Sequence, residues 1–348
     1  MVAVGMNASF AGHRSREARI VQHRCGKPPQ FLNTCVDNVG RPTNNFSMAD
    51  NQTPTVARST DVANRPIATT MSGALRYVDA AAVARGMAAV KRHEAISLGM
   101  PIVHGGGPIA PLRSPTQHFM RRHGGDYATG ARKEVDNFGF SDDVIMLSTH
   151  GTTHVDALCH VFCCGEMFGG IPATEVSSFG ARQLGAETLP PICTRAIVVD
   201  VVPADRQWLS AGEPISFRQI DSAISAAGLR CEPGDALLVR TGSLRAYRAG
   251  EAHDRSWPGL AADCKDWVID SKISIVGADN MGVEVIPSGV KGFATPLHTG
   301  LMFGHGVLFI ELLDLEAVAG RTFEAMLTIN PLRIVGGTAS PVAPMLVI

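Results

Sequence analysis

The sequence has few aromatic residues, almost no net charge and no long apolar run. Aromatic residues make up 6% of the 348 residues, and the formal net charge is −1. A protein that binds nucleic acid or an anionic membrane needs a basic field, and one that stacks bases needs aromatic side chains. A transmembrane helix needs about 18 or more consecutive apolar residues, and no such run occurs. We therefore expect a small-molecule substrate, with neither nucleic acid nor a membrane as partner.

The cysteines lack the regular spacing of a disulfide framework, and the N-terminus lacks the pattern of a secretory signal. We therefore expect reduced thiols in a cytoplasmic protein. Three cysteines adjoin the histidine cluster described below, either as small buried residues, as thiolate ligands or, for Cys159 or Cys163, as the nucleophile of a Cys–His enzyme. The eight cysteines are Cys25, Cys35, Cys159, Cys163, Cys164, Cys193, Cys231 and Cys264.

The first 70 residues differ from the rest of the chain. Residues 1–70 are rich in Asn, Thr, Arg, Ser and Pro and have no periodic apolar face, which predicts a disordered or loosely attached arm. Met48 is an alternative start, and a transit peptide is a second reading of the same segment. Residues 71–348 show no change of composition and no internal repeat, so we expect a single domain there.

Apolar periodicity predicts a mixed α/β fold for this domain. The Ala-rich segment 77–95 has helical spacing, and 96–102 has the pattern of a strand. Residues 105–140 are rich in Gly, Pro and Arg and predict a long loop over the site. Ser216 and Gln219 match a capping box that opens a helix ending near Gly228. Further strands are predicted at 196–202, 236–240, 273–277, 307–312 and 325–329.

The most informative segment is His150-Gly-Thr-Thr-His154-Val-Asp156-Ala-Leu-Cys-His160. His150, His154 and Asp156 stand at positions i, i+4 and i+6. Imidazole nitrogen and carboxylate oxygen together suit zinc, manganese or iron(II) better than calcium or magnesium. Three protein ligands leave coordination positions open for water or substrate, which is the arrangement of a catalytic site.

A histidine on its own is more often a hydrogen-bonded core residue than a metal ligand. Four metal-competent groups in one short segment are harder to explain in that way. The segment also follows the apolar run 144–147, so it has the pattern of a strand that ends in a functional loop. Gly151 and the two threonines after it disfavour a helix, and the His-Glu-x-x-His motif is absent.

His298 and Glu311 are candidates for the rest of the site. Glu311 ends an apolar run, and a carboxylate in a buried strand is costly unless it is paired or bound to a metal. Beside a cation it becomes a ligand or a general base. The alternative is an ion pair, with Arg240 as partner. His305 competes with His298, since it also precedes the predicted strand closely.

Polar residues also follow the strand predicted at 273–277. Asp279, Asn280 and Glu284 stand at its carboxyl end. In α/β folds such residues often line a site. Asp279 has the alternative of making hydrogen bonds within a turn.

These segments together resemble the metal-dependent cyclase superfamily, which includes kynurenine formamidases, isatin hydrolases and trans-dienelactone hydrolases. The family's hallmark resembles His-x-Gly-Thr-His-x-Asp-x-Pro-x-His, and the four His and Asp positions match. Thr152 and Leu158 replace the family's Gly and Pro, so we expect a different substrate wall. Further matches are Gly234–Gly242, Gly277–Asn280 with Glu284, His298 before Glu311, and Gly336–Pro341.

The resemblance covers residues 70–348 and implies a swivelling β/β/α fold with a mixed, barrel-like sheet, in a homodimer or homotetramer. It implies that His150, His154 and Asp156 bind a divalent metal, zinc first and manganese second. His298 and Glu311 then complete a second metal site or hold the catalytic water, and His160 is the acid/base.

Three functions remain open on the sequence alone. The first is hydrolysis of a cyclic amide, a lactone or an N-formyl amide. The second is a cyclase or dehydratase reaction on a polyketide-like intermediate with the same metal. The third is a non-catalytic metal-binding or scaffold protein.

Overall fold

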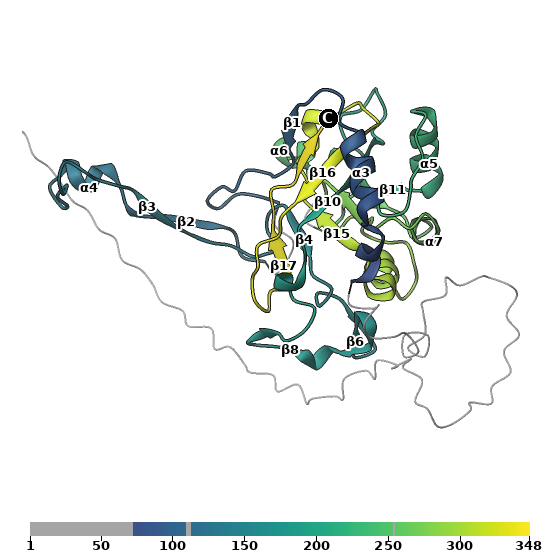
Figure 1. Cartoon of the computed structure of the whole chain (residues 1–348), viewed down its shortest axis with the longest axis horizontal. Helices are drawn as coiled ribbons and strands as arrows, with labels where there is room; N and C mark the ends of the chain where they lie inside the picture. Colours follow the sequence, from purple (N-terminus) through teal and green to yellow (C-terminus); the bar gives the residue numbers. More distant parts are fainter. Residues whose placement is uncertain (1–71, 109–112, 253–254) are drawn as a thin grey trace, which may run out of the picture. The chain divides into compact units, whose positions relative to one another are not determined.

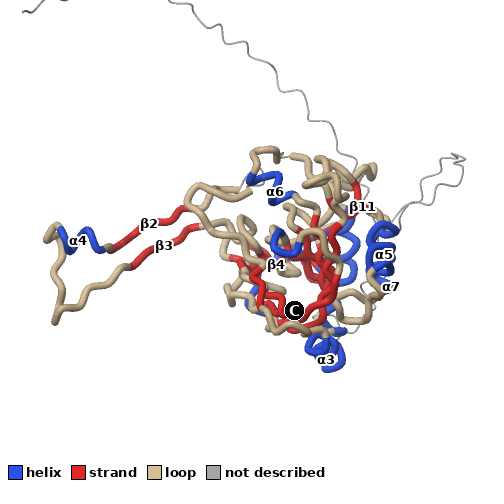
Figure 2. Tube along the Cα trace, turned by 90° about the horizontal axis from the view of Figure 1, so that it is seen from above, coloured by secondary structure: helices blue, strands red, loops and turns tan. Residues whose placement is uncertain are grey.

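The computed structural model describes residues 72–108, 113–252 and 255–348. All of them belong to one compact unit, Asp50–Ile348. The main layer of this unit is a nine-stranded mixed sheet with the order β1-β18-β16-β10-β12-β14-β15-β4-β17, curled into a half-barrel (Figure 2). The predicted fold class, mixed α/β with a barrel-like sheet, is confirmed. The disordered or loosely attached N-terminal segment predicted at 1–70 lies outside the described residues.

Four parallel neighbours form the centre of the sheet: β10 (Ile192–Asp200), β12 (Ala236–Arg240), β14 (Ile275–Ala278) and β15 (Leu308–Glu311). Strands buried on both faces have near-continuous apolar sequences, and these strands follow that rule. Nearly all of their side chains are buried, and Ile197, Leu238, Val276 and Phe309 have no exposed surface. Sequence analysis places all four within four residues of their observed ends.

Antiparallel strands flank this centre on both sides. On one side are β16 (Phe323–Ile329), β18 (Met345–Val347) and β1 (Ala95–Ser97). On the other side are β4 (His154–Asp156) and β17 (Ala339–Pro341). Apart from β16, each has three residues, which is too short to show an apolar period. For this reason β17 and β18 are not predicted from the sequence. The strand predicted at 96–102 is longer than the observed strand β1 and ends five residues later.

Helices pack against the sheet, and α3 and α5 both contact β10 (Figure 1). α3 (Ala80–Ala88) begins where the Asp79 carboxylate accepts a hydrogen bond from the Ala82 N–H, 2.9 Å long. The helix predicted at 77–95 is thus correct in type but ends earlier. α5 (Phe217–Ala226) has the predicted capping box, with Ser216 and Gln219 bonded reciprocally. The remaining longer helices are α6 (Ser243–Arg248) and α7 (Cys264–Asp270).

The predicted loop at 105–140 contains two regular elements, β2 (Gln117–Arg122) and α4 (Gly124–Ala128). β2 pairs with β3 (Asp142–Met146), which overlaps the strand predicted from the apolar run 144–147. We call residues 117–146 the arm, which stands clear of the sheet in Figure 1. All side chains of β3 and four of the six in β2 are exposed. Because neither face of β2 is buried, its sequence has no apolar alternation that predicts a strand.

No helix among the described residues is both long enough and apolar enough to cross a membrane.

Short elements connect the larger ones. The short strands are β5 (Phe162–Cys163), β6 (Glu166–Met167), β7 (Ile171–Pro172), β8 (Val176–Ser177), β9 (Gly180–Ala181), β11 (Pro214–Ile215) and β13 (Gly259–Leu260). The short helices are η1 (Gly73–Tyr77), η2 (Phe168–Gly170), η3 (Ala173–Glu175), η4 (Ala186–Thr188), η5 (His298–Phe303, a π-helix) and η6 (Glu316–Val318).

Candidate metal centre

Strand β4 presents two of the predicted ligands on one face. Side chains alternate along a strand, so His154 and Asp156 point the same way and Val155 points into the core. All three have no exposed surface. In the register of the sheet, Glu311 of β15 lies directly opposite His154. The pairing of two strands far apart in the sequence therefore brings a carboxylate beside the histidine.

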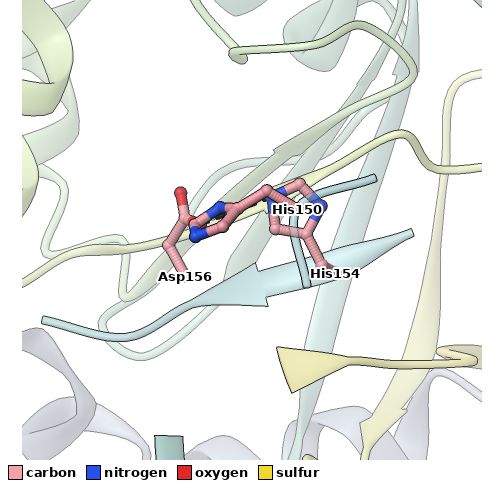
Figure 3. Close-up of side chains that lie close together, drawn as sticks. All are labelled: His150, His154 and Asp156. Atoms are coloured by element: carbon pink, nitrogen blue, oxygen red, sulfur yellow. Dashed lines mark ion pairs between the residues drawn. The ribbon is translucent and has the colours of Figure 1, made fainter. Parts of the chain in front are cut away.

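His150 reaches the same place from the loop before β4. Its Nδ1 atom lies 2.9 Å from Oδ1 of Asp156, and Nε2 of His154 lies 3.3 Å from the same oxygen. Figure 3 shows the three side chains turned toward one another beside β4. Their ligand atoms all lie within 4.8 Å of one another. The structure thus brings together the three residues predicted as the primary metal ligands.

The other predicted residues lie beside this group. His298 begins the π-helix η5, and its Nε2 atom lies 3.9 Å from Oδ2 of Asp156 and 3.4 Å from Oε1 of Glu311. The second oxygen of Glu311 lies 3.4 Å from Nε2 of His154. His160, Asp156 and His298 form a second group of ligand atoms within 4.8 Å. Asp156 is common to both groups, so the five predicted ligands and His160 make one cluster.

Each of the three predicted histidine ligands has an orienting partner for one ring nitrogen. Nδ1 of His154 lies 2.7 Å from the Thr152 carbonyl oxygen, and Nε2 of His150 lies 3.1 Å from Oγ1 of Thr338. Nδ1 of His298 lies 2.5 Å from Glu284. Metal-binding histidines are usually held in this way, which directs the other nitrogen at the ion.

Glu284 also fixes the backbone that carries His298. Its two oxygens accept hydrogen bonds from the N–H groups of Leu297 and His298, at 2.8 and 2.9 Å. The side chain is 1% exposed. One carboxylate therefore sets both the start of η5 and the orientation of the imidazole ring. We expect Glu284 to act as a positioning residue.

Four buried atoms of the cluster lack a hydrogen bond, and this shows whether a cation fits the site. Nδ1 of His150, Nε2 of His154 and both carboxylate oxygens of Asp156 have no hydrogen-bond partner within the described part of the chain. Buried polar atoms are nearly always hydrogen-bonded, and exceptions often mark an ion. Two imidazole nitrogens and a carboxylate converging on one point are the donor set of a zinc or manganese site. The residues present therefore fit a divalent metal.

Burial and charge act in opposite directions at these groups. Burial lowers the pKa of His160 to about 4, so its imidazole is neutral at pH 7. Burial also lowers the pKa of His298, but hydrogen bonds to Glu284 and Glu311 outweigh this effect and raise it to about 10. Burial raises the pKa of Asp156, yet the electrostatic interaction with the His160 ring and the contacts with His150 and His154 bring it well below the usual value. Asp156 is thus an ionised carboxylate.

A cavity of about 400 Å³ opens onto the cluster. Its walls include His160, His298 and Glu311, together with Phe162 and Arg113. The guanidinium of Arg113 donates a 2.7 Å hydrogen bond to the His150 carbonyl. The loop predicted over the site therefore does contribute a residue to it, although most of that segment forms the arm. A small molecule that enters this cavity meets His160 and the carboxylate of Glu311 together.

Several alternatives from the sequence are excluded by the structure. Arg240 pairs with Asp200 and Glu316, at 3.0 and 2.9 Å, so it is not the partner of Glu311. Asp279 accepts hydrogen bonds from the turn at Thr241 and Gly242, and lies under a neighbouring cavity instead.

None of the described cysteines belongs to the metal cluster. Cys159 contacts the Gly337 carbonyl, 3.6 Å away, and burial raises the pKa of its thiol to about 11. No group of metal-competent atoms among the described residues contains a cysteine.

Sequence reasoning missed Arg113 and Thr338 as parts of the site. The segment Gly336–Pro341 carries a family resemblance that pointed toward Thr338, but the contact with His150 spans 188 positions. Arg113 stands in a Gly- and Pro-rich stretch without periodicity, and no local signal marks it.

A curled mixed sheet and a buried His/Asp/Glu cluster that opens onto a cavity define an α/β protein with a metal-type active site. The chain belongs to the Cyclase family, whose family model matches residues 84–285. The family resemblance predicted from the motif is therefore confirmed.

Individual relatives agree with this assignment. The chain is similar to a kynurenine formamidase of Salinibacter ruber, with 28% identity over 223 residues, which are 62% of this chain and 84% of that protein. A crystal structure of a cyclase has a TM-score of 0.72 and 27% identity, covering 82% of this chain and 99% of that one. The fold is also that of isatin hydrolase A from Ralstonia solanacearum, with a TM-score of 0.56 and 21% identity over 77% of this chain and 94% of that one.

Proposed function

We propose that the protein is a metal-dependent hydrolase that cleaves a small cyclic amide, a lactone or an N-formyl amide at its carbonyl group. The observation that carries the proposal is the set of four buried, unpartnered atoms of His150, His154 and Asp156 beside an open cavity. Membership of the Cyclase family and the similarity to a kynurenine formamidase support hydrolysis of a C–N bond.

We propose zinc as the metal, with manganese as the second candidate. His150, His154 and Asp156 are the primary ligands, and His298 and Glu311 extend the set. Nitrogen and carboxylate donors in this combination are typical of catalytic zinc. When bound, a divalent cation polarises a carbonyl group and lowers the pKa of bound water to about 7.

The chain's own residues supply the proton transfer. His160 lines the cavity and belongs to the same cluster as Asp156 and His298. A neutral imidazole at this position takes a proton from the attacking water and returns it to the departing nitrogen or oxygen. Glu311 faces both His154 and His298 and holds the water in place by accepting its hydrogen bond.

The test combines elemental analysis with a substrate panel. Purified protein is expected to contain zinc or manganese and to hydrolyse at least one of N-formylkynurenine, isatin and a dienelactone. A chelator should abolish that activity, and the same metal should restore it. Metal without turnover of any panel member would favour the cyclase or the non-catalytic alternative. Turnover that survives complete metal removal would contradict the proposal.

We also propose that the protein is a homodimer or homotetramer in which the arm contacts a second copy. An isolated two-stranded hairpin is marginally stable in water. Its exposed apolar side chains gain stability only when another surface covers them. They are Phe119, Met120, Val135, Phe138, Phe140, Val144, Ile145 and Met146. Five described cysteines form no disulfide, which supports a location in the reducing cytoplasm; they are Cys159, Cys163, Cys193, Cys231 and Cys264.

A further inference from the structure

A second cavity, of about 240 Å³, collects aromatic residues that are scarce elsewhere in the chain. The sequence has three tryptophans and three tyrosines. Trp208, Trp257 and Tyr247 line this one cavity. We call it the aromatic cavity. Half of the tryptophan and tyrosine residues in the protein therefore face a single small space.

The charged groups among the described lining residues of the aromatic cavity are all acidic. Glu251 and Asp279 are its ionisable carboxyl groups, and no Lys, Arg or His side chain is among its described lining residues. Asp279 is buried and satisfied by Thr241 and Gly242. Glu251 is exposed, and its backbone N–H donates a 2.9 Å hydrogen bond to the Ala246 carbonyl, whereas its side-chain carboxylate has no hydrogen bond or ion pair among the described residues. A free carboxylate beside aromatic faces favours a positively charged ligand, because both attract a cation.

The aromatic cavity adjoins the cavity of the metal centre. Trp257 and Met281 line both spaces. The indole N–H of Trp257 donates a 3.1 Å hydrogen bond to the Glu284 carbonyl, and its ring faces Gly282, where an added Cβ would lie 3.3 Å from the ring. The indole is thereby held between the two cavities by the residue that also orients His298. A molecule bound at the metal centre can extend past Trp257.

We propose that the aromatic cavity binds the non-reacting end of the substrate, and that this end is a protonated amine or quaternary ammonium on an apolar or aromatic group. This inference rests on the proposed hydrolase function, because it places the reacting carbonyl beside His160 and Glu311. The cation lies among Trp208, Trp257 and Tyr247 with Glu251 as its counter-charge. Binding energy gained there positions the carbonyl at the metal centre.

The first experiment measures binding without catalysis. The full-length protein is titrated with benzyltrimethylammonium, with neutral neopentylbenzene as the matched uncharged ligand, and with phenylacetate. Because two of the three tryptophans line the cavity, intrinsic fluorescence reports occupancy directly. We expect the cation to change the emission and to bind more tightly than the neutral ligand, and phenylacetate to bind least. The response should be diminished in Trp208→Phe and retained in Trp267→Phe.

Charge variants make the same experiment specific. Glu251→Gln should weaken binding of the cation roughly two- to fivefold and leave binding of the neutral ligand unchanged. Glu134→Gln, which removes an exposed carboxylate of the arm, is the matched control and should change neither. Equal affinity for all three ligands, or a Glu251→Gln variant indistinguishable from the control, would overturn the proposal.

The second experiment separates this inference from the proposed function. Two N-formyl anilides are compared as substrates, one with a para trimethylammoniomethyl group and one with the isosteric neopentyl group. Glu251→Gln should raise KM for the cationic substrate alone, with kcat unchanged. Hydrolysis of both with equal KM in wild type and variant would overturn the cavity assignment and leave the hydrolase function intact. Selective cation binding without hydrolysis of any substrate would support the cavity assignment and contradict the hydrolase.

Discussion

Asp156 is the residue on which the metal centre depends. Its carboxylate has no exposed surface, and nitrogens of His150, His154 and His298 lie within 3.9 Å of its two oxygens. A buried charge is costly unless it is compensated by opposite charge or by a metal. The histidines around it are needed as metal ligands in their neutral form. A bound cation therefore resolves the electrostatics of the whole cluster.

Replacing His154 by Ala is expected to remove the metal. His154 is buried in the cluster, and its Nε2 atom lies 3.3 Å from Asp156 and 3.4 Å from Glu311 but makes no hydrogen bond among the described residues. The variant should lose stoichiometric metal by elemental analysis and lose at least about 100-fold in activity. His123→Ala, on the exposed arm, is the matched control and should keep both. Retention of one metal per chain by His154→Ala would show that this residue is not a ligand.

Replacing His160 by Ala is expected to separate metal binding from turnover. His160 lines the cavity, and its ring centre lies 4.1 Å from that of His150. We predict unchanged metal content and a kcat lower by roughly 100- to 10,000-fold, which is the usual contribution of general acid/base catalysis. Full activity of this variant would remove His160 from the mechanism.

At the residue scale, the sequence predicts the metal ligands better than the residues that orient them. The sequence predicts His150, His154 and Asp156 because they stand close together in the chain, on β4 and in the loop just before it. Glu284 was only noted as a polar residue after a strand, since its role depends on the fold bringing it to His298. Thr338 and Arg113 reach the site through single long-range contacts, and no property of their neighbours in sequence marks them.

At the element scale, the turn that starts α6 depends on a buried acid. Asp279 accepts hydrogen bonds from the N–H groups of Thr241 and Gly242, each shorter than 3 Å. Burial nonetheless raises its pKa to about 6. A carboxyl group with a raised pKa contributes stability that is fully present below its unfolded pKa, near 3.9, and is lost as the pH rises through 6.

The variant Asp279→Asn cannot ionise, so it tests this pH dependence. Relative to the variant, wild type should lose about 1.4 kcal/mol of unfolding free energy between pH 5 and pH 7.5. The variant should also be less stable at pH 5, because its amide cannot accept both backbone hydrogen bonds. Urea unfolding of both proteins at the two pH values provides the measurement. A stability difference that does not change with pH would mean that Asp279 does not titrate in this range.

The sequence predicts those helices and strands whose burial gives them a recognisable pattern of apolar residues. The central strands β10, β12, β14 and β15 are continuous apolar runs and were predicted near their true positions. Within the arm, β3 overlaps the strand predicted from the run 144–147, whereas β2 falls in the predicted loop, because a strand exposed on both faces has no apolar alternation. α3 was predicted too long, since alanines continue past Ala88, where the chain leaves the helix.

At the scale of the whole molecule, metal binding couples to stability. A ligand that binds only the folded state at 100 times its Kd adds about 2.7 kcal/mol to the free energy of unfolding. For a domain of this size, that corresponds to a fall in Tm of about 5 °C when the metal is removed. Differential scanning fluorimetry with and without a chelator should show this fall for wild type. The chelator should leave the Tm of His154→Ala unchanged, and an equal fall in that variant would assign the effect to another site.

The register between β4 and β15 has an evolutionary consequence. His154 stands opposite Glu311, and Val155 opposite Ile310, with all four side chains buried. A single-residue deletion or insertion inside either strand would turn His154 or Glu311 toward the hydrophobic core and Val155 or Ile310 toward the metal centre. Length variation among homologues should therefore be confined to segments such as the arm. A homologue whose alignment has a gap inside β4 is expected to have lost catalytic activity.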